Sequence, residues 1–333
     1  MQKEQQEMEY VCKFFDLGNL EKFDRITEGV LNHNYKLHTT KGVYFVKEAI
    51  NKKPDTLALI RDVENYMKEK NIPAVAMLQK ETGEFIVGYD EKNFIVYPFV
   101  ESDRSHTYVI QDYFRIGQMH AKIHEVTKDT IPPHFELDPI KKDNTKKIIE
   151  ILNTYKDNIR TKELLDGTDE LFLKYINLKL EILSSMKESD EIFTHQAHIL
   201  HGDYHAGNLL IDKHTREIIG VCDWEKTQKG SRGYEIARSA LFLFENFLIE
   251  HKNLKEYLNG YTSIYPISNQ ELYEGFVFRL KTIVKSKWIE KMYYDNDDSR
   301  ANKFIEKDIE RIKFFSPIIL NEDSESFFKK LLN

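Results

Sequence analysis

The sequence predicts an α+β fold in two parts, with a small β-rich part followed by a larger, mainly helical part. Short apolar and β-branched runs separated by polar turns fill residues 23–100, whereas apolar residues recur at helical spacing beyond residue 107. The 333 residues also exceed what a single hydrophobic core usually supports. We therefore expect two lobes, one at residues 1–100 and the other at residues 101–333.

The first lobe is expected to contain an antiparallel sheet and one helix. Strands are predicted at residues 23–30, 34–39 and 43–47, with further short apolar runs at 74–78, 85–87 and 94–100. The helix is predicted at residues 54–70, because Pro54 suits a first helical turn. Its apolar side chains recur at helical spacing and are Leu57, Ile60, Val63 and Met67.

The second lobe is expected to be helical. A helix is predicted at about residues 107–126, with an apolar face that includes Ile110, Phe114 and Ala121. A strongly apolar helix is predicted at residues 236–250. Both helices are expected to belong to the core.

One segment carries a recognisable chemistry, His201-Gly202-Asp203-Tyr204-His205-Ala206-Gly207-Asn208, which Asp223-Trp224-Glu225 follows. Asp203 in such a loop can accept a proton from an attacking hydroxyl, and Asn208 and Asp223 can hold a metal ion against nucleotide phosphates. Two apolar runs flank a polar turn at residues 213–216 and predict a hairpin that returns Asp223 to Asp203. The pattern therefore predicts a phosphoryl-transfer centre with Asp203 as the base.

These motifs resemble those of the aminoglycoside phosphotransferase and choline kinase superfamily of small-molecule kinases. Gly202 and Trp224-Glu225 differ from the Arg and Phe-Gly that protein kinases usually have there, which favours a small-molecule acceptor. The resemblance implies a two-lobed protein-kinase-like fold, with ATP and Mg²⁺ as cofactors. It also implies a hydroxyl acceptor on an aminoglycoside, an amino alcohol, a homoserine-like amino acid or a sugar.

Lys47 and Glu64 are the candidates for holding the nucleotide phosphates. Lys47 ends a predicted strand and can reach phosphates as a point charge, while Glu64 on the following helix can hold it in place. The alternatives are a surface lysine on an alternating strand and a surface carboxylate, since Asp62 and Glu69 lie on the same helix.

The resemblance implies further nucleotide contacts in the first lobe. The chain lacks the G-x-G-x-x-G loop of protein kinases, and residues 29–35, which include Gly29 and Asn34, resemble the shorter Gly/Asn loop of the superfamily. In the resembled fold the hinge backbone binds adenine, which places Phe99 and Val100 at the nucleotide.

Three side chains near the motif keep more than one interpretation. Glu225 is a second metal ligand, an organiser of the loop, or a solvated carboxylate at a strand end. In the resembled family, the role that the position of His201 implies is to brace the loop through backbone hydrogen bonds rather than to take part in catalysis. Glu235 replaces the Asp that braces the loop in many members, and its longer carboxylate can make similar bonds.

Histidines offer an alternative function, a zinc or di-metal hydrolase. His201, Asp203 and His205 on an extended strand would project to one side, near His195 and His198. The kinase interpretation explains more, because a zinc site has no need of Asn208 or Asp223. His120 and His124, four residues apart on a predicted helix, are either metal ligands or core or helix-surface histidines. A further alternative is a catalytically silent, kinase-like interaction or coat protein.

Composition and charge limit the partners. A net charge of −7 and a pI near 6.0 argue against nucleic acid as the main partner. The polar start and the absence of any apolar run of about twenty residues argue against a secretory signal and a membrane span, so the cytoplasm is expected. The two cysteines, Cys12 and Cys222, are expected to be reduced. The sequence does not indicate which oligomeric state the protein has.

Overall fold

The structure, a computed structural model, describes residues 2–26, 33–50, 52–103, 108–129, 131–140, 144–186, 197–243, 251–296, 298 and 301–321. These residues confirm the predicted α+β class, with a five-stranded antiparallel sheet and many helices. They form two compact units. The first comprises Met1–Tyr108, Ile131–Glu136 and His201–Thr227, and the second comprises Val109–Thr130, Leu137–Leu200 and Gln228–Asn333. The lobe boundary near residue 100 stays a prediction, because each compact unit combines segments that are far apart in the sequence.

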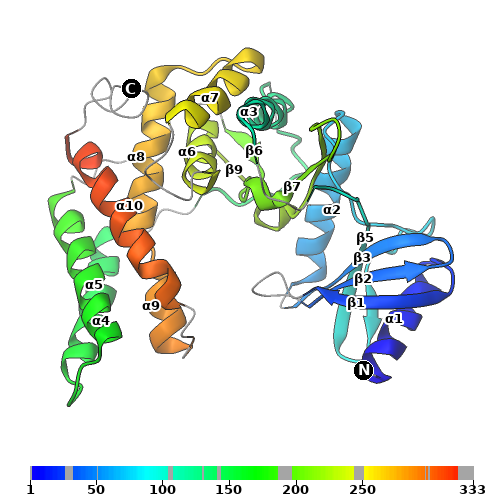
Figure 1. Cartoon of the computed structure of the whole chain (residues 1–333), viewed down its shortest axis with the longest axis horizontal. Helices are drawn as coiled ribbons and strands as arrows, with labels where there is room; N and C mark the ends of the chain where they lie inside the picture. Colours follow the sequence, from blue (N-terminus) through cyan, green and yellow to red (C-terminus); the bar gives the residue numbers. More distant parts are fainter. Residues whose placement is uncertain are drawn as a thin grey trace. The chain divides into compact units, whose positions relative to one another are not determined.

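The first unit is built on the sheet, whose strand order is β1-β2-β3-β5-β4 (Figure 1). Its strands are β1 (Leu20–Ile26), β2 (Asn34–Thr39), β3 (Gly42–Glu48), β4 (Val87–Tyr89) and β5 (Lys92–Pro98). The three predicted strands are confirmed where they are described, and residues 27–30 lie outside the described residues. The predicted run at 74–78 contains no named strand, but Ala74 forms a single bridge with Val221.

One face of the sheet is covered by α1 (Gln2–Phe14), as Figure 1 shows. Its buried Met8, Val11 and Cys12 share a hydrophobic cluster with Leu37 of β2 and Val46 of β3. Side chains alternate along a strand, so Lys47, which directly follows Val46, points to the opposite face of the sheet. Lys47 is thereby turned away from α1.

The predicted helix is confirmed as α2 (Pro54–Glu69), with a proline in its first turn. The four apolar residues at helical spacing are all buried, and so is Glu64. The amphipathic pattern therefore identified the inner face of this helix correctly.

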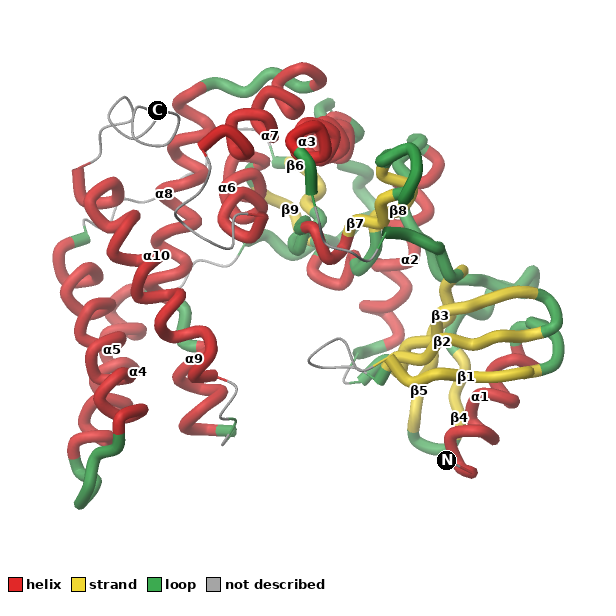
Figure 2. Tube along the Cα trace, in the orientation of Figure 1, coloured by secondary structure: helices red, strands yellow, loops and turns green. Residues whose placement is uncertain are grey.

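The second unit is mainly helical (Figure 2). Its helices are α3 (Ile110–Glu125), α4 (Thr145–Arg160), α5 (Gly167–Ser185), α6 (Arg232–Leu243), α7 (His251–Ile264), α8 (Asn269–Lys285), α9 (Trp288–Glu290) and α10 (Asn302–Asn321). A π-helical turn, η3 (Lys291–Asp295), follows α9, and the short strands β6 (His198–Leu200) and β9 (Gln228–Gly230) pair antiparallel. The predicted helix at 236–250 is observed as α6 up to Leu243, and residues 244–250 lie outside the described residues. Within the described part of the chain, no helix is long and apolar enough to cross a membrane.

Helices α3 and α7 pack closely because each presents a glycine to the other. A Cβ atom built on Gly117 of α3 would lie 2.0 Å from the carbonyl oxygen of Tyr257, and one built on Gly260 of α7 would lie 2.0 Å from that of Phe114. Both positions therefore exclude any side chain while the helices keep this spacing. The backbones approach closely enough for buried polar side chains to meet.

These polar side chains form a buried network around Glu235. The Nε2 atoms of His120 and His124 lie 3.2 and 2.9 Å from its Oε2 atom. The Nδ1 atoms accept from the hydroxyls of Tyr257 and Tyr261, at 2.6 and 2.8 Å. Both ring nitrogens of each histidine thus have a partner, which confirms the interpretation as core histidines. Glu235 binds two histidines here, and the loop-bracing role stays a prediction.

The buried histidines should make stability depend on pH. Burial and the charge of Arg232 lower the pKa of His198 from 6.5 to about 4. Between these values the unfolded chain binds a proton that the folded chain excludes, so His198 contributes stability above pH 6.5 that is lost as pH falls toward 4. His198→Asn keeps a donor for the carbonyl oxygen of His124, which the Nδ1 atom contacts at 3.0 Å. On acidification over this range, we expect the free energy of unfolding to fall less in this variant than in the wild type. The difference should be about 1.4 kcal/mol per pH unit.

Urea unfolding at a series of pH values would measure this difference in slope. His214→Asn, at an exposed turn, is the matched control and should follow the wild type. Equal slopes for His198→Asn and the wild type would contradict the expected exclusion of the proton.

Candidate functional site

The predicted hairpin is confirmed and brings the two halves of the motif together. Strands β7 (Leu209–Ile211) and β8 (Ile218–Val221) pair antiparallel. The 3₁₀ turn η1 (Ala206–Asn208) precedes β7, and the turn η2 (Trp224–Lys226) follows Asp223. The backbone N–H of Cys222 donates to the carbonyl oxygen of Asn208 at 3.0 Å. Asn208 and Asp223 therefore emerge beside each other from the same end of the hairpin.

His201 braces the loop that carries Asp203, as the family resemblance implied. The imidazole is fully buried, and its Nε2 atom donates to the carbonyl oxygen of Cys222 at 3.0 Å. Its Nδ1 atom accepts from the backbone N–H of Asp203 at 3.2 Å. One ring thus joins the loop before β7 to the loop after β8.

Gly202 allows these two loops to touch. It has a φ of +80°, and a Cβ atom built on it would lie 1.8 Å from the carbonyl oxygen of Lys226. Both the conformation and the space require glycine. On the other side of the contact, the fully buried Trp224 packs its indole against His201, with ring centroids 4.5 Å apart.

Asp203 has a largely buried side chain, with 10% of its surface exposed. Its Oδ2 atom lies 2.7 Å from the Nζ atom of Lys226 and 3.8 Å from the Nε2 atom of His205. Its carbonyl oxygen accepts from the side-chain amide of Asn208 at 2.9 Å. The Asp203 loop and the Asn208 side chain are thus joined through the amide nitrogen of Asn208, and metal binding by its amide oxygen stays a prediction.

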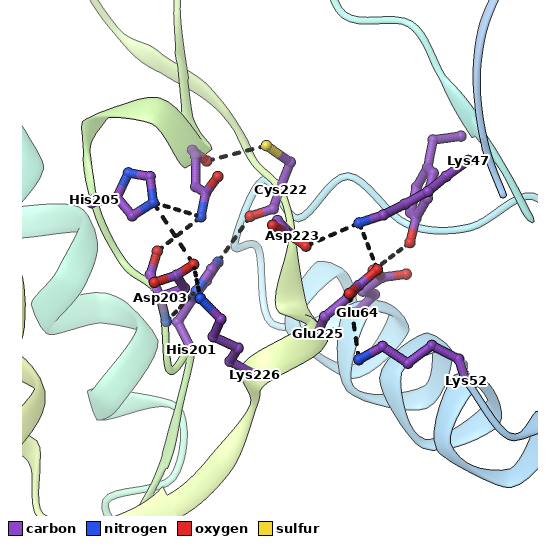
Figure 3. A network of polar contacts seen from close by, with 12 residues as sticks. Lys47, Lys52, Glu64, His201, Asp203, His205, Cys222, Asp223, Glu225 and Lys226 are labelled. Atoms are coloured by element: carbon purple, nitrogen blue, oxygen red, sulfur yellow. Dashed lines mark hydrogen bonds and ion pairs between the residues drawn. The ribbon is translucent and has the colours of Figure 1, made fainter. Parts of the chain in front are cut away.

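Asp223 adopts a left-handed conformation, with φ of +64° and ψ of +58°. Asp tolerates this region better than most residues, so the sequence suits the turn. Its Oδ1 atom lies 3.3 Å from the Nζ atom of Lys47, which also contacts Glu225 Oε1 at 2.5 Å (Figure 3). Burial alone would lower the pKa of Lys47, but the charges of Asp223 and Glu225 outweigh burial and raise it. Lys47 is therefore a firmly charged ammonium beside both acidic side chains.

The predicted ion pair between Lys47 and Glu64 is wrong for this structure. The Glu64 carboxylate accepts instead from the backbone N–H of Met77 at 3.0 Å and from the hydroxyl of Tyr97 at 3.3 Å. Burial raises the pKa of Glu64 to about 8, although these bonds and the charge of Lys47 act in the opposite direction. The left-handed turn at Asp223 presents Glu225 to Lys47, so Glu225 has the partner expected for Glu64.

The other predicted nucleotide residues lie on the sheet or just after it. Asn34 is opposite Lys47 in the β2–β3 register, so the two side chains share a face. The Oδ1 atom of Asn34 is buried and has no hydrogen-bond partner among the described residues. Phe99 donates its N–H to the carbonyl oxygen of Val43, and Val100 follows it half-buried. Gly29 lies outside the described residues.

The donor set suits a hard cation. Asn208 supplies an amide oxygen, and Asp223 and Glu225 supply carboxylates, which are the ligand types that Mg²⁺ prefers. The Asp223 side chain is 40% exposed and that of Glu225 15% exposed, so the first has more access to solvent and ligands. Glu225 contacts Lys52 at 3.4 Å as well as Lys47. Its present role is that of an organiser, and metal binding by Glu225 stays a prediction.

The described histidines of the motif segment have partners other than a shared metal site. His201 uses both ring nitrogens for the backbone, and His198 lies buried beside His124. His195 lies outside the described residues. Among the described residues, the group of His, Cys, Asp and Glu side chains close enough to share an ion is the network of His120, His124 and Glu235. The described histidines of the motif segment, His198, His201 and His205, do not belong to that group.

Comparison with protein families matches residues 22–266 to the phosphotransferase enzyme family. This match spans more than half of the chain and includes every predicted site residue. The chain belongs to that family. It is accordingly a phosphotransferase enzyme. Comparison with curated proteins found no match.

Solved structures show the fold that this phosphotransferase shares. Spectinomycin phosphotransferase in complex with ADP and spectinomycin has a TM-score of 0.68 at 15% identity, covering 94% of this chain and 98% of the other. An aminoglycoside phosphotransferase from Alicyclobacillus acidocaldarius has a TM-score of 0.67 at 13% identity, with 95% and 94% covered. An amicoumacin kinase in complex with AMP-PNP, Ca²⁺ and Ami has a TM-score of 0.59 at 15% identity, with 92% and 96% covered. The protein-kinase-like fold is thereby confirmed.

Two lysines of the candidate site were not predicted from the sequence. Lys52 contacts Glu225, and Lys226 contacts Asp203. Lys226 directly follows the Asp-Trp-Glu motif, and this position in the sequence could have identified it as a site residue. Lys52 lies between a strand and a helix among other lysines, where no local pattern distinguishes it.

Proposed function

We propose that this phosphotransferase moves the γ-phosphoryl group of ATP to a hydroxyl of a small molecule. One observation carries the proposal: within one compact unit, Lys47 contacts Asp223 while Asn208 contacts both the loop of Asp203 and the strand end that leads to Asp223. A base, two oxygen ligands and a phosphate-binding cation are the parts that phosphoryl transfer requires.

Each side chain has a role in this proposal. Asp203 accepts the proton of the acceptor hydroxyl, whose oxygen forms a bond to the γ-phosphorus as the bond to the β-phosphate oxygen breaks and ADP leaves. Asn208 and Asp223 would hold Mg²⁺, which when bound neutralises charge on the phosphate oxygens. Lys47 binds phosphate oxygens as a point charge. Positioning and charge neutralisation supply most of the rate in such a reaction, because its transition state is loose.

The fold neighbours and the net charge support the nucleotide and the kind of acceptor. Structures with ADP and with AMP-PNP and Ca²⁺ are known for proteins of the same fold. Their substrates, spectinomycin and amicoumacin, are small molecules. The net charge of −7 favours a cationic or neutral acceptor. Aminoglycosides, amino alcohols, homoserine-like amino acids and sugars are the classes to test.

An acceptor-dependent ADP assay tests the proposal. Purified protein with Mg·ATP is offered one acceptor class at a time, and Asp203→Asn serves as the blank in every reaction. We expect ADP release with one class of acceptor and a phosphorylated product of matching mass, both missing from the blank. Nucleotide binding without turnover of any class would favour the silent kinase-like interaction protein instead.

A further inference from the structure

Lys226 places a cation on the carboxylate that is proposed to act as the base. Its Nζ atom lies 2.7 Å from Asp203 Oδ2, as Figure 3 shows. The Lys226 side chain is 59% exposed, whereas that of Asp203 is 10% exposed. The carboxylate is thus fixed in the protein, and the ammonium reaches it from the solvent side on a flexible stem.

The backbone of Lys226 packs against the same loop. Lys226 ends the turn η2, whose buried Trp224 packs on His201. Its carbonyl oxygen occupies the space that any side chain at Gly202 would need. The backbone that carries the ammonium thus packs against the loop of Asp203, and the side-chain torsions of Lys226 provide the freedom to move the ammonium.

This location puts the ammonium within reach of the group being transferred. A base must lie about 2.6–3.2 Å from the hydroxyl it deprotonates. The attacking oxygen must lie about 3–3.5 Å from the phosphorus. An ammonium that contacts the base therefore lies near the phosphoryl oxygens, and its side-chain torsions allow it to turn toward them. The carboxylate and the phosphoryl group are both negative, so a cation between them relieves their repulsion.

We propose that Lys226 binds the γ-phosphoryl group during turnover, as a second lysine distinct from Lys47. The inference rests on the proposed kinase function. Lys47 faces Asp223 and Glu225, on the metal side of the site. Lys226 faces Asp203, on the acceptor side. The two lysines thus contact different parts of the triphosphate. Lys226 contacts the γ-phosphoryl oxygens, which are transferred to the acceptor.

The test compares nucleotides with and without a γ-phosphoryl group. Mg·ADP and Mg·AMP-PNP are titrated calorimetrically into wild type, Lys226→Met, Lys226→Arg and the control Lys213→Met, an exposed lysine of the hairpin turn. For Lys226→Met we expect about tenfold weaker AMP-PNP binding, with ADP affinity within about twofold of wild type. Lys226→Arg should restore most of the AMP-PNP affinity, and Lys213→Met should match the wild type. An unchanged ratio of the two affinities in Lys226→Met would overturn the proposal.

Turnover provides a second readout that separates this inference from the proposed function. With an active acceptor, Lys226→Met should lower kcat by roughly 10- to 10²-fold and leave the KM of the acceptor nearly unchanged. A purely structural role would instead lower the melting temperature and affect both nucleotides alike. If the wild type turned over no acceptor, the kinase proposal would fail, whereas the ratio of AMP-PNP to ADP affinity would still decide whether Lys226 contacts the γ-phosphoryl group.

Discussion

Asp203→Asn is expected to lower kcat by roughly 10²-fold or more while nucleotide affinity stays at the wild-type level. Asparagine has the same shape but accepts no proton. The loop should survive, because its contacts with His201 and Asn208 use the backbone N–H and carbonyl oxygen of Asp203 rather than the side chain. Steady-state kinetics with the active acceptor and calorimetric titration with Mg·ADP would measure the two quantities.

Asp212→Asn is the matched control for this variant. Asp212 lies on the same hairpin, and its exposed carboxylate accepts from the backbone N–H groups of His214 and Thr215, which an asparagine oxygen can also do. We expect turnover close to wild type. Wild-type turnover in Asp203→Asn itself would refute the assignment of Asp203 as the base.

The second large effect is expected for Asp223→Asn. Asparagine tolerates the left-handed backbone at this position but removes the charge that would bind Mg²⁺. We expect kcat to fall by roughly 10²- to 10³-fold and the Mg²⁺ concentration for half-maximal rate to rise. A Mg²⁺ titration of initial rates would show both changes. Lys47 should stay in place, because its contact with Glu225 remains.

Asp90→Asn controls for both the backbone and the lost charge. Asp90 also has a left-handed conformation, with φ of +53°, and lies in the turn between β4 and β5, where its side chain makes a surface ion pair with Lys3. Its activity and Mg²⁺ dependence should equal those of the wild type. An Asp223→Asn protein with an unaltered Mg²⁺ requirement would exclude Asp223 as a metal ligand.

The sequence predicted the elements whose signals are local. The hairpin of β7 and β8, the strand that carries Lys47 and the inner face of α2 follow from alternation, turn residues and helical spacing. Helix α1 was missed, although Met8, Val11 and Cys12 have helical spacing. Its many charged and amide side chains are typical of a solvent-exposed terminus. The burial of its apolar face depends on packing against the sheet, which the local sequence does not indicate.

Ion pairs were harder to predict than elements, because they depend on how turns orient side chains. Glu64 has the right helix and the right charge to meet Lys47, but Met77 and Tyr97 occupy its carboxylate. The left-handed turn at Asp223 decides the outcome, since it presents Glu225 instead. No spacing along the chain encodes such a choice.

The contact between Gly202 and the Lys226 carbonyl also limits how this enzyme can evolve. Protein kinases usually carry arginine at the position of Gly202, yet here even a methyl group would collide with backbone atoms. A stepwise path between the two loop types must first reroute the chain around Lys226, and single substitutions at position 202 would be eliminated before any benefit arose. Because the collision is with main-chain atoms, no exchange of the side chain at position 226 would relieve it, and glycine at position 202 should persist for as long as the chain keeps this course.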